Sequence, residues 1–186
     1  MTLTTAPSPT LLRPVECAVP PDSAIAARLS GADFVDAWTV EAADPHLPAL
    51  GQFLLSVAAT PAWVERLMSW RNRLVSRLGL KDLGGLGSLD RHRPAEAYQP
   101  GDRVGIFTLF QNAPHEALLG DRDKHLDVVL SVFKTVSPDG RSAQVTVTTV
   151  VHTHNAWGRL YMLPVAPMHK LIVPAVLKAI GHPARV

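Results

Sequence analysis

The sequence predicts one α+β domain, and three features of the chain support this prediction. A strand-like stretch at residues 32–40, rich in β-branched and aromatic residues, precedes two helical stretches between residues 45 and 78. From Pro100 onward the chain becomes rich in strand-like segments, with a hairpin turn at residues 137–140. From Asn155, apolar residues recur with helical spacing. A strand, two helices, an antiparallel sheet and a long final helix form an α+β layout.

Length and composition fit a globular domain and exclude several classes of protein. The 186 residues are 47% hydrophobic and 18% charged, a balance that argues against intrinsic disorder. The net charge of +2 is too small for a protein that must neutralise many phosphates, so we expect no nucleic-acid partner. The single cysteine, Cys17, excludes an internal disulfide network and a cysteine-based zinc site. We expect residues 1–14 to form a flexible arm and residues 15–186 to form one domain.

Targeting and membrane signals are not apparent in the sequence. The first fourteen residues contain three prolines and lack both a basic segment and a continuous apolar segment, which predicts a cytoplasmic location. The longest apolar stretch, residues 156–180, contains three prolines, one histidine and three basic residues, so we expect no membrane span. The sequence leaves a monomer and a homodimer equally open.

The predicted helices have recognisable starts. Ser23 precedes a short helical stretch that Gly31 ends, and Thr60 with Pro61 marks the start of the second of the two consecutive helices. Along that second helix, apolar residues recur every three or four positions, which predicts a stripe that packs in the core. The stripe consists of Trp63, Leu67, Trp70, Leu74 and Leu78.

Residues 79–100 form a loop that is longer than most compact domains contain, so we predict a lid over a binding site. Its Gly85-Leu86-Gly87 segment is not a dinucleotide fingerprint, because it follows a helix and Asp90 occupies the position of the third glycine. Basic residues concentrate between residues 61 and 93, which favours a solvated surface over an anion site. The strands are expected at residues 103–112, 115–120, 124–136 and 143–154.

Three histidines and one aspartate form a candidate site on the predicted hairpin. A two-residue Asp139-Gly140 turn would pair Pro138 with Arg141, and a four-residue loop would keep the same register, whereas a three-residue loop would shift it. In that register His125 faces His154, and Asp127 faces His152. Because side chains alternate along a strand, all four would project from one face.

Three interpretations of this cluster are open. Cross-strand polar pairing on a solvated face is the first, because the other face of the hairpin is richer in apolar residues and should meet the core. The second is acid–base chemistry by an imidazole that a carboxylate orients. The least favoured is a metal site, which would use His125, Asp127, His152 and His154.

Three segments carry a family resemblance, namely ADFVDAW at residues 32–38, GDRVGIFTLF followed by EALLGDRDKHLD between residues 101 and 127, and TVTTVVHTHNAWGRLYMLPVAPMHKLIV at residues 146–173. Together they resemble a bacterial family of unknown function in the START-like, polyketide-cyclase-like superfamily. The resemblance covers residues 15 to 178, and its most specific part is His154-Asn155 with Gly158-Arg159, Tyr161, Pro167 and His169. Its other parts include the His125-Leu126-Asp127 element, together with Glu116 and Gly120. Val128 and Met168 stand where the family pattern has aromatic residues, and His152 is not part of that pattern.

The resemblance implies a helix-grip fold, in which a curved antiparallel sheet wraps around the long C-terminal helix and encloses a hydrophobic cavity. It also implies small apolar or amphipathic ligands, without implying a reaction or a cofactor. The candidate ligand-binding residues are Arg159, Tyr161, Asn155, Trp38, Phe107 and Glu116. The alternatives are a surface salt bridge for Arg159 and core positions for Trp38 and Phe107; we expect His169 to be a hydrogen-bonded core histidine.

These observations predict a protein that binds a small hydrophobic molecule and cyclises, isomerises or dehydrates it. In this hypothesis His125, Asp127 and His154 move protons and Arg159 orients the substrate. The alternative is a non-catalytic carrier or sensor with the same cavity and structural histidines. A metal-dependent enzyme that uses the His/Asp cluster is the third hypothesis.

Overall fold

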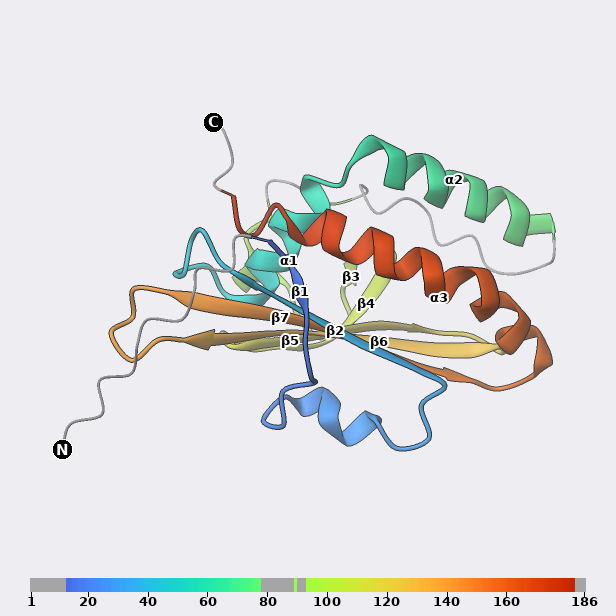
Figure 1. Ribbon diagram of the computed structural model, residues 1–186, viewed down its shortest axis with the longest axis horizontal. Helices are drawn as coiled ribbons and strands as arrows, with labels where there is room; N and C mark the ends of the chain where they lie inside the picture. The colour runs from blue at the N-terminus through green and yellow to red at the C-terminus, as the bar shows by residue number, and fades with distance from the viewer. Residues whose placement is uncertain (1–12, 78–88, 90–92, 183–186) are drawn as a thin grey trace.

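The computed structural model describes residues 13–77, 89 and 93–182, which form an antiparallel sheet with helices on both of its faces (Figure 1). The strand order is β1-β2-β7-β6-β5-β4-β3. The strands are β1 (Val15–Glu16), β2 (Phe34–Glu41), β3 (Arg103–Val104), β4 (Phe107–Asn112), β5 (Glu116–Arg122), β6 (Leu126–Val136) and β7 (Ala143–Thr153). The helices are α1 (Ala49–Ala58), α2 (Ala62–Arg77) and α3 (Ala156–Leu177), and two short 3₁₀ helices are η1 (Ala24–Arg28) and η2 (Ala95–Ala97). The predicted α+β, helix-grip-like arrangement is confirmed, including the two helices after the first long strand.

The β6–β7 hairpin has the predicted register but a longer turn than the two-residue one. The backbone N–H of Ser137 donates to the carbonyl of Ser142 at 2.9 Å, so residues 138–141 form a four-residue loop. Gly140 takes a φ of 71°, which a residue with a side chain rarely adopts. Because this loop has an even number of residues, Asp127 still pairs with His152.

The two faces of the sheet pack against different partners. The face toward α1 and α3 contributes Val132, Val145 and Val147 to the main core, together with Leu50 of α1. On the other face, Val129 and Val150 pack in a smaller cluster with residues such as Ile25 of η1. In Figure 1, η1 lies on one side of the sheet, and α2 and α3 lie on the other. The expectation that the apolar face of the hairpin meets the main core is confirmed.

Helix α3 is held at its two ends. Its N-cap is Asn155, as predicted, and the side-chain oxygen of Asn155 accepts a hydrogen bond from the N–H of Gly158 at 3.1 Å. Gly158 is buried so close to the turn before β6 that a Cβ there would lie 2.2 Å from the carbonyl oxygen of His125. Leu177, at the other end, is the second buried residue of the helix. Between these points the residues of α3 are partly buried or exposed.

Helix α2 does not present its apolar stripe to the core as predicted. Val64 is buried, but Trp63 and Trp70 are exposed. The spacing of apolar residues shows which positions share one face of the helix, but not whether that face packs against the rest of the domain. Here Leu67 of the stripe and the neighbouring Met68 line an open cavity. Most of the loop predicted as a lid, namely residues 79–88 and 90–92, lies outside the described residues.

Candidate functional site

A cavity of about 350 Å³ lies between the sheet and the helices α1, α2 and α3. Leu130 and Val147 form part of its floor, and Val165 and Ile172 of α3 are opposite them. Most of its lining is apolar. The size is within the range of small-molecule sites, whereas well-packed cores leave few voids larger than a water molecule.

One wall of the cavity contains a polar array that joins three elements of the fold. The Nδ1 of His169, on α3, lies 2.9 Å from Oδ2 of Asp36 on β2. The Nε2 of the same ring lies 3.4 Å from the hydroxyl of Thr149 on β7. His169 and Thr149 both line the cavity. The array therefore presents an imidazole to any molecule that enters.

The Asp36 carboxylate is held away from solvent. Its side chain is 1% exposed, and Oδ2 also accepts a hydrogen bond from the indole N–H of Trp38 at 3.1 Å. Its other oxygen, Oδ1, has no hydrogen-bond partner among the described residues. A buried carboxylate oxygen without a partner is costly, so the strength of the contact with His169 matters for the fold.

This geometry fixes the tautomer of a neutral His169. An ionised carboxylate only accepts hydrogen bonds, so Nδ1 carries the proton that it donates to Asp36. The lone pair of Nε2 then points toward the Thr149 hydroxyl and the cavity. An imidazole oriented by a carboxylate is the common device for taking up and returning a proton near neutral pH.

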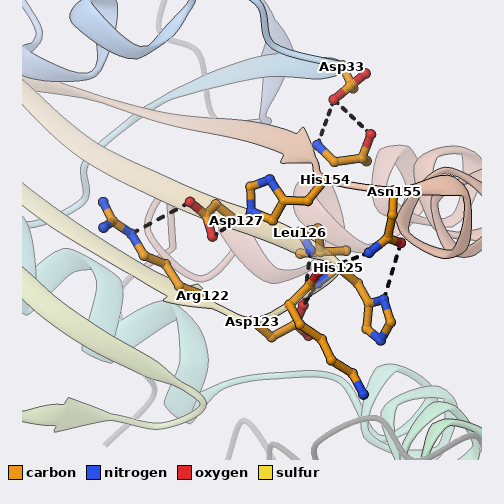
Figure 2. Close-up of polar contacts among 10 residues, drawn as sticks. Asp33, Arg122, Asp123, His125, Leu126, Asp127, His154 and Asn155 are labelled. Carbon is orange, nitrogen blue, oxygen red and sulfur yellow. Dashed lines mark hydrogen bonds and ion pairs between the residues drawn. The ribbon is translucent and has the colours of Figure 1, made fainter.

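The predicted histidine cluster does not converge into one site. Asp127 and His154 form a pair, with 3.1 Å between Oδ1 and Nε2, and Arg122 lies 3.8 Å from the other carboxylate oxygen. His154 points toward Asp127, while His125 points away from both, toward Asn155 (Figure 2). The pair is more exposed than the Asp36–His169 pair, at 29% for the Asp127 side chain and 43% for that of His154.

His125 belongs to the cavity side of the sheet, contrary to the expected common face. It precedes β6 in the turn after β5, where the alternation of a strand does not apply. Its Nδ1 lies 3.2 Å from the side-chain oxygen of Asn155, and the residue lines the cavity beside Asp123. Asn155 also donates to the carbonyl of Lys124 at 2.9 Å, so it joins this turn to the start of α3.

His152 pairs directly with Asp127, as predicted, and shares the η1 face of the sheet with it, but its Nε2 is 2.9 Å from the carbonyl oxygen of Arg28 at the end of η1. The four candidate ligands are thus divided among three environments. Within the part of the chain that the structure describes, no group of three His, Cys, Asp or Glu side chains is placed to hold a metal ion.

Some of the other predicted ligand-binding residues line the cavity, whereas the rest lie elsewhere in the structure. Phe107 and Tyr161 line the cavity, and Trp38 packs against the main core beside Asp36. Arg159 is exposed at the start of α3. Glu116 is buried on the η1 face, where it accepts hydrogen bonds from Ser131 and from the N–H of Ala24. Its contacts anchor η1 to the sheet, away from the cavity.

A surface carboxylate near α3 has a perturbed pKa. The backbone N–H of Thr153 donates to Asp33 at 2.6 Å, and its hydroxyl donates at 2.9 Å. These two hydrogen bonds, the backbone one first, lower the pKa of Asp33 below its ordinary range, and the charge of Arg159 adds to the effect. Asp33 connects the start of β2 to the end of β7.

Asp36 was not among the residues singled out from the sequence, and His169 was expected only as a core histidine. The two residues are 133 positions apart, so no local motif connects them. A signal was nevertheless present, because each is an ionisable residue on an otherwise apolar surface of its element. Asp36 lies between Phe34 and Trp38 on the same face of β2, and His169 follows Val165 by one helical turn.

A protein-family model described as "Protein of unknown function (DUF2867)" matches residues 28–176. The matched range contains β2 to β7 and nearly all of α3, and so it includes both Asp36 and His169. No match was found among the curated proteins or the solved structures.

Proposed function

The chain belongs to the DUF2867 family of proteins of unknown function, and we propose that this member binds a small, largely apolar molecule in its cavity. The observation that carries the proposal is the 350 Å³ cavity with its apolar lining and the buried Asp36–His169 pair in the wall. A void of this size between well-formed elements costs stability, and a bound apolar molecule would offset that cost.

The polar residues of the cavity suggest an amphipathic ligand. His169 offers one hydrogen-bonding group in the wall, and Asp121, Asp123 and His125 offer others near the start of α3. A few placed polar groups in an apolar pocket usually fix the orientation of a ligand.

The helix-grip-like order of elements supports a place in the START-like superfamily, and lipids, polyketides and hormone-like rings would suit such a pocket. A cytoplasmic location is part of this proposal.

The Asp36–His169 pair favours a second function, an isomerisation by proton transfer. Nε2 of His169 would take a proton from a carbon atom next to a carbonyl group, and the imidazolium would return it to another carbon of the same molecule. Asp36 would stabilise the imidazolium through its hydrogen bond to Nδ1. The step moves one proton and needs no oxidant, reductant or cofactor. The alternative is a carrier in which His169 only binds.

Binding is tested with the fluorescent apolar probe N-phenyl-1-naphthylamine. Val165 lines the cavity, so Val165→Trp should fill it and weaken probe binding by about tenfold or more. Leu163, two positions away, is 70% exposed on the outer side of α3, and Leu163→Trp is the matched control that should bind like the wild type. Equal affinity of all three proteins, or no binding by the wild type, would overturn the proposal.

Proton transfer is tested on whatever molecule native mass spectrometry finds bound to the purified protein. Incubation in D₂O should give deuterium incorporation with the wild type, and His169→Gln should bind the molecule but lose the exchange. His154→Gln is the control and should exchange normally, because its ring contacts Asp127 outside the cavity lining. Absence of exchange in the wild type would support the carrier and contradict the isomerase.

A further inference from the structure

Helix α3 is apolar on its solvent side as well as on its cavity side. Leu160, Leu163 and Leu171 are all exposed, and Trp157, which also lines the cavity, is exposed at the start of the helix; we call these four residues the outer stripe. A helix on the surface of a globular protein ordinarily has polar residues on its outer side, so a helix that is apolar all round needs a second apolar environment. The outer stripe is therefore a candidate docking surface.

The charged side chains on α3 itself are all positive. Residues 156–186 contain no Asp or Glu, and Arg159, Lys170 and Lys178 are exposed along α3 and at its end. Lys170 contacts Glu16 at 3.0 Å, but both side chains are half exposed, and such pairs add little stability. An apolar stripe bordered by cations is complementary to a surface with apolar and anionic groups.

We propose that the outer stripe docks onto the surface of a bilayer that contains anionic phospholipids. Leucine side chains would enter the boundary of the acyl chains, Trp157 would lie at the level of the headgroups, and the basic side chains would contact lipid phosphates. Helix α2 lines the same cavity as α3, and its Trp70 and Arg66 are also exposed.

The helix would lie along the membrane surface and not cross it. By length and composition α3 is the one helix among the described residues that could span a bilayer. However, Gly158 is packed against the His125 carbonyl, and Leu177 is buried in the main core. These contacts tie both ends of the helix to the domain, and Arg159 and Lys170 would be costly in the hydrocarbon layer.

A second copy of the chain fits the outer stripe less well than a membrane. In a two-fold symmetric dimer the same patch faces itself, so the basic residues of one copy would approach those of the other. Like charges across an interface oppose association, whereas anionic lipids would neutralise them.

Co-sedimentation of the full chain with vesicles tests the proposal, and no cavity ligand is needed. We expect binding to vesicles rich in phosphatidylglycerol to exceed binding to pure phosphatidylcholine vesicles by about tenfold or more, and to weaken as salt is added. Leu163→Glu combined with Leu171→Glu should abolish binding. Both positions are exposed, so the variant should fold and should still bind N-phenyl-1-naphthylamine.

The matched control is Val35→Glu, which adds a carboxylate at an exposed apolar position on β2, on the η1 face of the sheet. It should sediment like the wild type. No binding of the wild type to anionic vesicles, or equal binding by the Leu163/Leu171 double variant, would overturn the proposal. A wild-type dimer that this double variant converts to a monomer would also overturn it, in favour of a second copy. Because probe binding is measured separately, the proposal of a ligand-binding cavity and the proposal of membrane docking can be contradicted independently.

Discussion

Within the residues that the structure describes, two histidine–aspartate pairs differ in their surroundings and hardly at all in their chemistry. The His169–Asp36 distance is 2.9 Å and the His154–Asp127 distance is 3.1 Å. The Asp36 side chain is 1% exposed, compared with 29% for that of Asp127. An interaction between charges is screened by water at the surface and much less in the interior. Burial, and not the residue types or the distance, distinguishes the pair in the cavity wall, which can contact a ligand, from the exposed pair at the open end of the β6–β7 hairpin.

The largest expected difference between the two pairs is in stability. His169→Ala should lower the free energy of unfolding by about 2–4 kcal/mol, because it leaves the buried Asp36 carboxylate with only the Trp38 hydrogen bond. His154→Ala should lower it by less than about 1 kcal/mol, since exposed ion pairs contribute little. Urea denaturation of the two variants measures both effects.

Equal losses of stability in His169→Ala and His154→Ala would show that the difference in burial does not make the two pairs differ in their contribution to stability. The control is His169→Ala combined with Asp36→Leu, which removes the buried charge together with its partner. This double variant should regain part of the lost stability, as expected where an unpaired buried carboxylate causes the loss. A further loss in the double variant would contradict that explanation.

The second expected effect concerns the contact that holds His125 on the cavity side, away from His154. A Cβ at position 158 would lie 2.2 Å from the backbone oxygen of His125, so Gly158→Ala must move the start of α3 or the turn. We expect a loss of about 1–3 kcal/mol, measured by chemical denaturation. In Gly51→Ala the new Cβ would lie 3.2 Å from the Pro48 side chain, and the change should stay within about 1 kcal/mol. If the two variants were equally stable, the anchoring role of Gly158 would be wrong.

The smallest effect is expected at Asp33, an exposed carboxylate whose hydrogen bonds go to Thr153. Hydrogen bonds to the ionised form lower its pKa, so they stabilise the fold above the ordinary pKa of an aspartate. This contribution is lost as the pH falls through the lowered value in the folded protein. In Asp33→Asn the difference in urea midpoint between pH 7 and pH 3 should be slightly smaller than in the wild type. An unchanged difference would mean that Asp33 does not contribute to acid sensitivity.

The sequence was sufficient for most of the fold but not for the buried site. Local signals located Ser23 and Asn155 as helix starts, and the even-numbered loop at residues 138–141 was one of the two options that preserved the pairing of Asp127 with His152. Those signals act over a few residues or across one hairpin. The contact between Asp36 and His169 depends on where α3 crosses the sheet, and this crossing is set by packing over the whole chain.

The same limit explains the partly wrong expectation for the histidine cluster. Strand alternation placed His154 and Asp127 on one face, and the structure brings them together. Alternation did not hold for His125, which belongs to the turn between β5 and β6, and it could not predict the contact of His152 with the carbonyl of Arg28 at the end of η1. Sequence periodicity holds within an element, so its predictions are weakest at the ends of elements, where side chains contact other parts of the fold.

The three prolines within α3 have a consequence for ligand selectivity. Pro164, Pro167 and Pro174 have no N–H to give to the carbonyl one turn earlier, so the helix is easier to bend at three places. The wall near them also contains Met162 and Met168, whose unbranched side chains adapt to irregular shapes. Such a helix could bend to match the depth of the cavity to the size of the bound molecule. We therefore expect the protein to accept a series of molecules of graded size with similar affinity, where a rigid pocket would select one.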